Sequence, residues 1–189
     1  MKRTTLHFFA ILTLGIALTG CGPKKEADSS ETAKAENEEK FDTKASEKDA
    51  DFVANAVAGN YAEIKMAELA KTRSANTEVQ ALAAMLVDDH TKVLTELKEF
   101  ATQRGISIPL EEKDDAKEKV NDLSKQDAKD FDKQWCKTLV EKHEKTIQDF
   151  ESTYDKTEDT TLKEWINQTL PSLKTHLDKL NTCEKNLKS

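Results

Sequence analysis

Apolar residues recur at every third or fourth position from Ala50 to the end of the chain, which is the period of an α-helix. Four such stretches can be recognised, at residues 50–73, 77–104, 127–154 and 160–187, and polar segments separate them. No stretch shows the alternation of apolar and polar residues that is typical of a half-buried strand. The pattern therefore predicts an all-α fold, an antiparallel four-helix bundle of ordinary domain size.

Capping and turn residues mark the ends of the predicted helices. Asn76 or Thr77 is the expected N-cap of the second helix, and Gly105 is expected to end it. The charged segment 111–125 predicts a crossover that contains a short helix. We expect the third and fourth helices to fold back on each other near Asp159, within an acidic, threonine-rich turn.

The chain begins with two basic residues after Met1, followed by an apolar run at 8–18. This run is shorter than the ~20 residues that a membrane-spanning helix needs, so it predicts the core of a signal peptide covering residues 1–20. The run ends in Leu18-Thr19-Gly20-Cys21, which resembles a bacterial lipobox and implies lipidation of Cys21. Acyl chains on Cys21 would anchor the protein stably in a membrane. The open alternative is an ordinary secretion signal with an incidental cysteine.

Residues 21–48 are rich in Lys, Glu, Ser, Ala and Asp and contain few apolar residues. Because such a segment buries too little surface to offset the entropy of ordering, we expect a lipidated Cys21 and a disordered tether there. The folded bundle is then expected at 49–189. Gly22, rather than an aspartate, follows Cys21. In enterobacterial lipoproteins this accompanies delivery to the outer membrane, so a lipid-anchored position in the bacterial envelope, at the outer membrane, is the expected location.

The formal net charge is −7. Removal of residues 1–20 takes away Lys2 and Arg3 and no acid, which makes the charge −9. An acidic surface disfavours nucleic acid and electrostatic docking on anionic lipid. We therefore expect contact with the membrane through the lipid anchor and no nucleic-acid partner.

Two unlike pairs of residues predict the same register for the last two helices. Cys136 and Cys183 are centred on the turn near Asp159, and so are His143 and His176. In an exported protein two facing cysteines favour a disulfide, which in the chain-entropy model is worth ~4 kcal/mol for a loop of this length. Two thiolate metal ligands are the alternative, but the cysteines lie ~10 Å along the helix axis from the histidines.

Each predicted helix carries one metal-capable residue on its apolar face: Glu63, His90, His143 and His176. Imidazoles and a carboxylate that converge in a bundle core suit a zinc, copper or iron ion. Asp88 and Asp89 are next to His90 and are candidates to orient an imidazole from outside the ligand set.

A polar network without metal is the alternative reading of this apolar face. In that network the histidines would serve as hydrogen-bonded core residues that determine the register of the bundle. Glu63 would pair with Lys65 or with the hydroxyl of Tyr61 instead of sharing a metal ion with the histidines.

Several short segments together resemble a known family: Asp51-Phe52-Val53, Ala62-Glu63, Met85-Leu86-Val87-Asp88-Asp89-His90, Val140-Glu141-Lys142-His143 and Thr169-Leu170-Pro171-Ser172-Leu173-Lys174-Thr175-His176. They are similar to a bacterial family of predicted exported or outer-membrane proteins, domain of unknown function 4142, over about residues 49–180. The resemblance implies a ferritin-like four-helix bundle whose polar core is Glu63, His90, His143 and His176. It implies no particular activity.

One departure separates this chain from di-iron ferritin-like proteins, which carry Glu-x-x-His on two helices. Val87 and Leu173 stand three residues before His90 and His176. We therefore expect a single histidine-rich mononuclear site rather than a di-iron centre.

Three functions remain after this reading of the sequence. The first is a lipid-anchored module that binds a metal ion. The second is a structural or protein-interaction lipoprotein without metal. The third, a metal-dependent oxidase or peroxidase, is the least favoured, because the chain carries no Gly-rich phosphate loop and no Cys-x-x-Cys pair.

Overall fold

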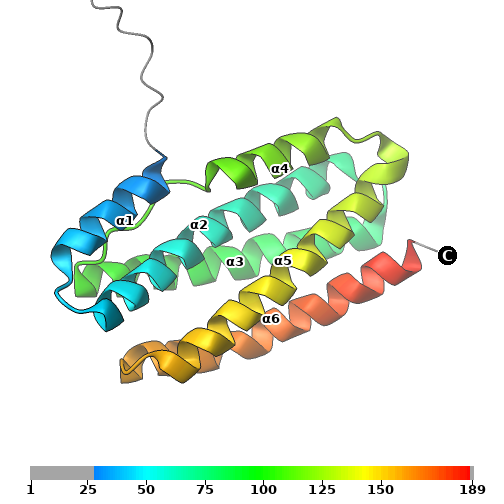
Figure 1. Ribbon diagram of the computed structural model, residues 1–189. Coiled ribbons are helices and arrows are strands. Elements are labelled where there is room, and N and C mark those ends of the chain that lie inside the picture. The colour runs from blue at the N-terminus through cyan, green and yellow to red at the C-terminus, as the bar shows by residue number, and fades with distance from the viewer. Residues whose placement is uncertain (1–27, 188–189) are drawn as a thin grey trace, which may run out of the picture.

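The computed structural model describes residues 28–187, and within this range the chain forms six α-helices and no strand. The helices are α1 (Ser29–Lys40), α2 (Lys44–Arg73), α3 (Thr77–Arg104), α4 (Asp114–Lys125), α5 (Ala128–Lys156) and α6 (Thr160–Asn186). The prediction of an all-α bundle is therefore confirmed. The four long helices α2, α3, α5 and α6 are the predicted ones, and α4 is the short helix expected in the crossover (Figure 1).

Capping residues account for where the long helices begin and end. The Asn76 side chain accepts hydrogen bonds from the backbone N–H groups of Glu78 and Val79, as expected for an N-cap. At the other end of α3, Gly105 has φ 69°, a left-handed conformation that a residue without a Cβ adopts at little cost. Asp159 caps α6 in the same way as Asn76 caps α3. The predicted turns at these three positions are confirmed.

The prediction of a disordered tether up to residue 48 is wrong for residues 29–48. Helix α1 begins at Ser29, α2 begins at Lys44, and α1 packs against α2. Asn37 is completely buried, its Nδ2 donates to the Ser107 carbonyl at 2.9 Å, and its Oδ1 accepts from the Ser107 N–H at 2.7 Å. A polar side chain therefore holds α1 in place. The prediction considered only apolar residues and so did not include this contact. The folded domain starts near residue 29, not at 49.

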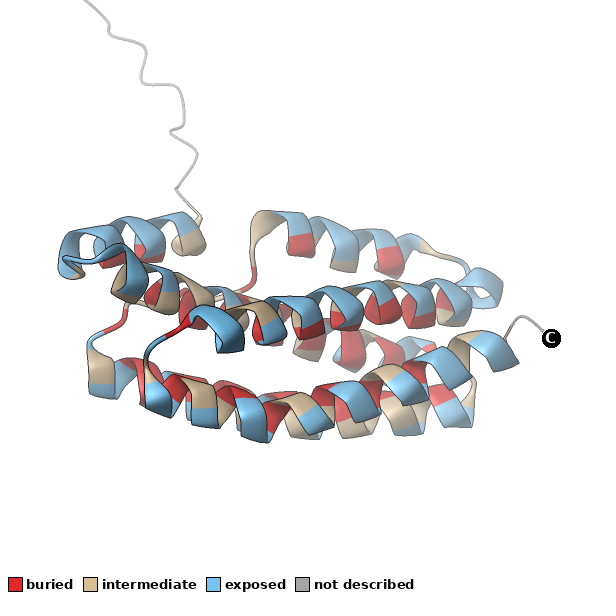
Figure 2. Ribbon diagram, turned by 60° about the horizontal axis from the view of Figure 1, so that its bottom comes forward, coloured by how far each residue is buried: buried red, intermediate tan, exposed pale blue. Residues whose placement is uncertain are grey.

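The core consists of two apolar clusters with a polar layer between them. The first cluster includes Val53, Leu97, Ile147 and Ile166, and the second includes Met66, Leu86, Trp135, Leu139 and Leu180. Along each long helix, polar residues stand between members of the two clusters. Figure 2 shows the buried residues on the faces of the long helices that turn toward one another, with exposed residues on the outer faces.

A disulfide joins α5 to α6 at the end of the bundle that holds the second cluster. Cys136 and Cys183 are bonded, with their Cα atoms 6.2 Å apart. The predicted disulfide, and with it the predicted register of the two helices, is confirmed. Among the described residues, no helix has the length and apolar character needed to cross a membrane.

Candidate metal centre

The polar layer is built by one residue from each long helix. Glu63 comes from α2, His90 from α3, His143 from α5 and His176 from α6. Their exposed fractions are 4%, 4%, 0% and 3%. The structure thus brings together all four residues that the sequence singled out as metal-capable.

The three imidazoles form a nearly equilateral triangle. Their ring centroids are 5.5 Å apart for His90 and His143, 5.3 Å for His90 and His176, and 5.5 Å for His143 and His176. One nitrogen from each ring can be chosen so that all three lie within 4.8 Å of one another. Three nitrogen ligands at such separations can reach a single metal ion.

Hydrogen bonds outside the triangle determine which nitrogen of His143 and of His176 carries the proton. His143 Nδ1 lies 3.0 Å from the Leu139 carbonyl, which only accepts, so Nδ1 donates and Nε2 is left with a lone pair. His176 Nε2 lies 3.1 Å from Asp89 Oδ2 and donates to it, which leaves a lone pair on Nδ1. These two unprotonated nitrogens face each other at 3.4 Å.

His90 is oriented by an asparagine that the sequence analysis did not single out. Asn60 Nδ2 donates to the Ala56 carbonyl at 2.8 Å, so its Oδ1 is the atom that faces His90. His90 Nδ1 lies 2.9 Å from this Oδ1 and donates to it. The neutral ring therefore keeps its lone pair on Nε2, the same arrangement by which neighbouring groups orient metal-binding histidines in proteins.

Glu63 is next to two of the imidazoles and has an oxygen without a hydrogen-bond partner. Its Oε2 lies 3.2 Å from His90 Nε2 and 3.3 Å from His143 Nδ1. Neither contact has hydrogen-bond geometry, and both Glu63 Oε2 and His90 Nε2 are buried and unpartnered. The alternative pairing of Glu63 with Lys65 is wrong, because Lys65 Nζ binds Glu112 Oε1 at 2.7 Å.

The electrostatics of the layer favour the neutral forms of His143 and His176 and the ionised form of Glu63. Burial lowers the pKa of His143, and it lowers the pKa of His176 to about 4 although the hydrogen bond that His176 donates to Asp89 opposes the shift. Burial alone would raise the pKa of Glu63, but the positive charge that His143 and His90 carry when they are protonated outweighs it and holds that pKa well below its usual range. Neutral imidazoles and a carboxylate are the protonation states that bind metal.

One pair of donors already has the spacing of two ligands on a tetrahedral metal ion. With metal–nitrogen bonds of 2.0–2.1 Å, two nitrogens on one tetrahedral ion are ~3.3 Å apart, close to the 3.4 Å between His143 Nε2 and His176 Nδ1. Without a cation or an extra proton, two lone pairs would face each other in a buried site, which is unfavourable. Glu63 lies beside the triangle, and the group whose ligand atoms all lie within 4.8 Å consists of the three histidines.

The two aspartates that were expected to orient an imidazole differ in position. Asp89 contacts His176 on α6 rather than its neighbour His90, and its side chain is one-third exposed. Asp88 is exposed. Sequence reasoning also missed Ser172, whose Oγ lies 3.3 Å from His176 Nε2. Its position four residues before His176 on the same helix was the signal that could have identified it.

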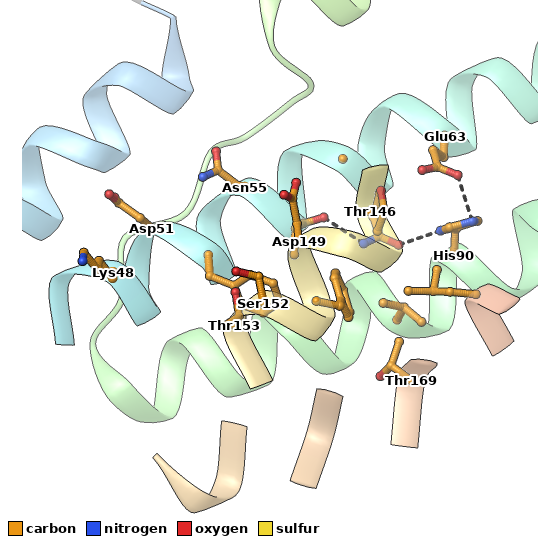
Figure 3. A pocket seen from close by; sticks show the side chains of 17 residues that line it. Lys48, Asp51, Asn55, Glu63, His90, Thr146, Asp149, Ser152, Thr153 and Thr169 are labelled. Atoms are coloured by element: carbon orange, nitrogen blue, oxygen red, sulfur yellow. Dashed lines mark hydrogen bonds and ion pairs between the residues drawn. The ribbon is translucent and has the colours of Figure 1, made fainter. Parts of the chain in front are cut away.

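A cavity of about 360 Å³ reaches the layer from the surface. Residues of α2 and α5 form its walls, with smaller contributions from α3 and α6. Figure 3 shows Lys48 and Asp51 at one end and Glu63 and His90 at the other, the last two joined by a dashed line. The site is buried, and two of its residues, Glu63 and His90, line the inner end of this cavity.

Two expectations concern residues outside the described range, namely the signal peptide at 1–20 and the lipidated Cys21. The other two cysteines are joined to each other and so do not contribute thiolates to the polar layer.

Comparison with known proteins identifies the family of the chain. The family described as domain of unknown function 4142 matches residues 34–182. No curated protein and no solved structure matched the chain. The matched range begins within α1, in agreement with a folded domain that starts before residue 49. Since the match spans well over half of the sequence, the chain belongs to the family described as domain of unknown function 4142.

Proposed function

We propose that the protein is a lipid-anchored protein of the bacterial envelope whose helical bundle binds one divalent transition-metal ion at His90, His143 and His176. The observation that carries this proposal is the pair of unprotonated nitrogens, His143 Nε2 and His176 Nδ1, which face each other at 3.4 Å inside a triangle of buried imidazoles. A metal ion at the centre of the triangle provides the positive charge that these lone pairs require.

The donor set favours one ion rather than two. Carboxylate-rich sites hold the two iron ions of ferritin-like proteins, whereas the described polar layer contains three imidazoles and a single fully buried carboxylate, Glu63. Imidazole nitrogen suits zinc, copper and iron. A mononuclear ion in this series, held by the three histidines with Glu63 nearby, is the centre that we propose.

The lipid anchor is supported by the sequence and is compatible with the disulfide. Leu18-Thr19-Gly20-Cys21 resembles a lipobox directly after an apolar core, and the Cys136–Cys183 bond suits an oxidising compartment outside the cytoplasm. Metabolic labelling with a fatty acid tests the anchor. A Cys21→Ser chain that still incorporates label would contradict it.

Elemental analysis tests the metal site. The full chain, purified without a chelator or a histidine tag, is expected to carry about one metal ion per chain, and the His90→Ala, His143→Ala double variant is expected to carry none. Absence of metal from the native chain, together with a melting temperature that is unchanged by chelators and by added Zn²⁺, would contradict the site. That result would favour a structural or protein-interaction lipoprotein.

A matched pair of aspartate variants tests the geometry of the site more finely. Asp89→Asn weakens the hydrogen bond that orients His176, and loss of such a partner costs roughly 10- to 100-fold in metal affinity. Asp88→Asn removes the same charge one residue away on an exposed side chain. It is expected to leave the affinity for Zn²⁺ unchanged, so equal effects of the two substitutions would contradict the proposed geometry.

A further inference from the structure

The cavity between α2 and α5 ends at two residues that each have a buried polar atom without a hydrogen-bond partner. Glu63 Oε2 and His90 Nε2 are both unpartnered, and both residues line the cavity. Each residue is 4% exposed, so these atoms are removed from bulk water at the inner end of the cavity. Unpaired acceptors at that position favour a positively charged guest.

The charges along the cavity also favour a cation. Asp51 and Asp149 line it together with Glu63, whereas Lys48 is the one basic residue among the described side chains that line it. The hydroxyl groups of Ser152 and Thr153 add oxygen donors near the outer end (Figure 3). A passage with an excess of carboxylates raises the local concentration of cations and repels anions. Its volume of about 360 Å³ is ample for a hydrated metal ion.

The opposite side of the layer is closed. His143 Nδ1 contacts the carbonyl of Leu139, a member of the second apolar cluster, in which Trp135 and Leu139 are completely buried. Trp135 is further held by the hydrogen bond from its Nε1 to the Met66 carbonyl at 2.8 Å. An ion that moved along the bundle axis in this direction would have to cross packed apolar side chains, which is costly for a charge.

We propose that this cavity is the route by which a hydrated divalent cation enters and leaves the histidine triangle, so that the centre exchanges its metal with the surroundings. The inference rests on the proposed metal site and adds that the bound ion is exchanged with the surroundings. A protein that exchanges metal this way takes up and donates the ion, as a buffer or carrier does. A structural zinc site, in contrast, is closed by its ligands.

Gly59 allows the route to be blocked with a closely matched control. It lines the cavity from within α2, and a Cβ at this position would meet no atom within 4 Å. Gly59→Leu extends a side chain into this space, whereas Gly59→Ala adds only the Cβ. Ala and Leu have similar helix propensities, so the two variants differ mainly in how far they fill the cavity.

The measurement is the rate of Zn²⁺ uptake and release in stopped-flow mixing. Uptake is followed by tryptophan fluorescence and release by transfer to an excess of a chromogenic chelator. Gly59→Leu is expected to slow both rates by at least roughly tenfold and to leave the equilibrium affinity for Zn²⁺ unchanged, because the ligands are intact. Gly59→Ala is expected to behave as the native chain.

A second pair of variants tests the charge of the passage and does not depend on the blocked variant being folded. Asp149→Asn is expected to slow uptake by about two- to tenfold at low salt, and the difference from the native chain is expected to shrink as salt is added. Asp155→Asn removes the same charge from an exposed position of the same helix, outside the cavity, and is expected to leave uptake unchanged.

The outcomes separate the two proposals. Zn²⁺ binding with equal rates in Gly59→Leu and Gly59→Ala, or equal uptake in Asp149→Asn and Asp155→Asn, would overturn the route and leave the metal site standing. Uptake would then take place elsewhere, for example past the partly exposed Asp89. Absence of Zn²⁺ binding in the native chain would overturn both proposals together.

Discussion

The core contains two kinds of region, and they contribute differently to the protein. The two apolar clusters gain free energy from burial, since about 25 cal/mol is gained for each Å² of apolar surface removed from water. The layer between them buries a carboxylate and three imidazoles, which costs free energy unless partners are supplied. The clusters therefore account for the stability of the bundle. The proposed metal site accounts for a polar layer at a position where apolar side chains would stabilise the bundle more.

The largest effect is expected from the second apolar cluster. Trp135 is completely buried and donates a hydrogen bond to the Met66 carbonyl. Trp135→Ala leaves a cavity and an unpaired carbonyl, so we expect it to lower the free energy of unfolding by about 3–5 kcal/mol. Chemical denaturation of the oxidised chain measures this. A loss below about 1 kcal/mol would show that the cluster is not the main source of stability.

The opposite result is expected when the polar layer is made apolar. The variant with Glu63→Met, His90→Leu, His143→Leu and His176→Leu removes every charged or imidazole group of the layer at similar volume. In the absence of metal its free energy of unfolding is expected to be unchanged or higher by up to about 4 kcal/mol, and Zn²⁺ binding is expected to be lost. A loss of stability as large as that of Trp135→Ala would instead identify the layer as a structural network.

The pH dependence of the free energy of unfolding is a smaller effect that also distinguishes the polar layer from the apolar clusters. In the unfolded chain histidine takes up a proton near pH 6.5, whereas burial lowers the pKa of His176 to about 4 and also lowers that of His143. Between these pH values the unfolded state binds more protons, so the stability of the metal-free protein is expected to fall as the pH falls from about 6.5 to about 4. Glu63, whose pKa is held below its usual range, adds a further loss at the acidic end.

Denaturation curves of the metal-free chain across this pH range measure the slope. The apolar clusters contain no titrating groups, so the quadruple apolar variant is expected to show a much weaker dependence than the native chain. Equal slopes in the two proteins would show that the acid sensitivity comes from surface carboxylates instead.

The long helices were predictable because their signals are local. The apolar period of 3.6 residues, the cap at Asn76, the left-handed Gly105 and the turn before Asp159 all act within a few residues of where they stand. The pairing of Cys136 with Cys183 and of His143 with His176 was also predictable, because a short turn fixes the register of an antiparallel hairpin.

Helix α1, the role of Asn60 and the imidazole that Asp89 contacts were not predictable in this way. Asn37 stabilises α1 through Ser107, which is 70 positions away in sequence, so no local pattern marks it. Asn60 on α2 contacts His90 on α3, 30 positions away in the sequence. Asp89 was expected to orient an imidazole, but the sequence did not say which one. The structure shows that it contacts His176 on α6, whereas successive helical residues point in different directions and His90 contacts Asn60.

The sequence by itself determined the class of fold, the four long helices, the disulfide and the identity of the four metal-capable core residues. Spacing along a helix and the presence of a short turn are sufficient for each of these. Tertiary structure alone decided which nitrogen of each imidazole is unprotonated, how close the rings come and where solvent reaches them. Those properties depend on hydrogen bonds and packing between helices that are distant in sequence, and a gap between α2 and α5 exists only once all the helices are in place.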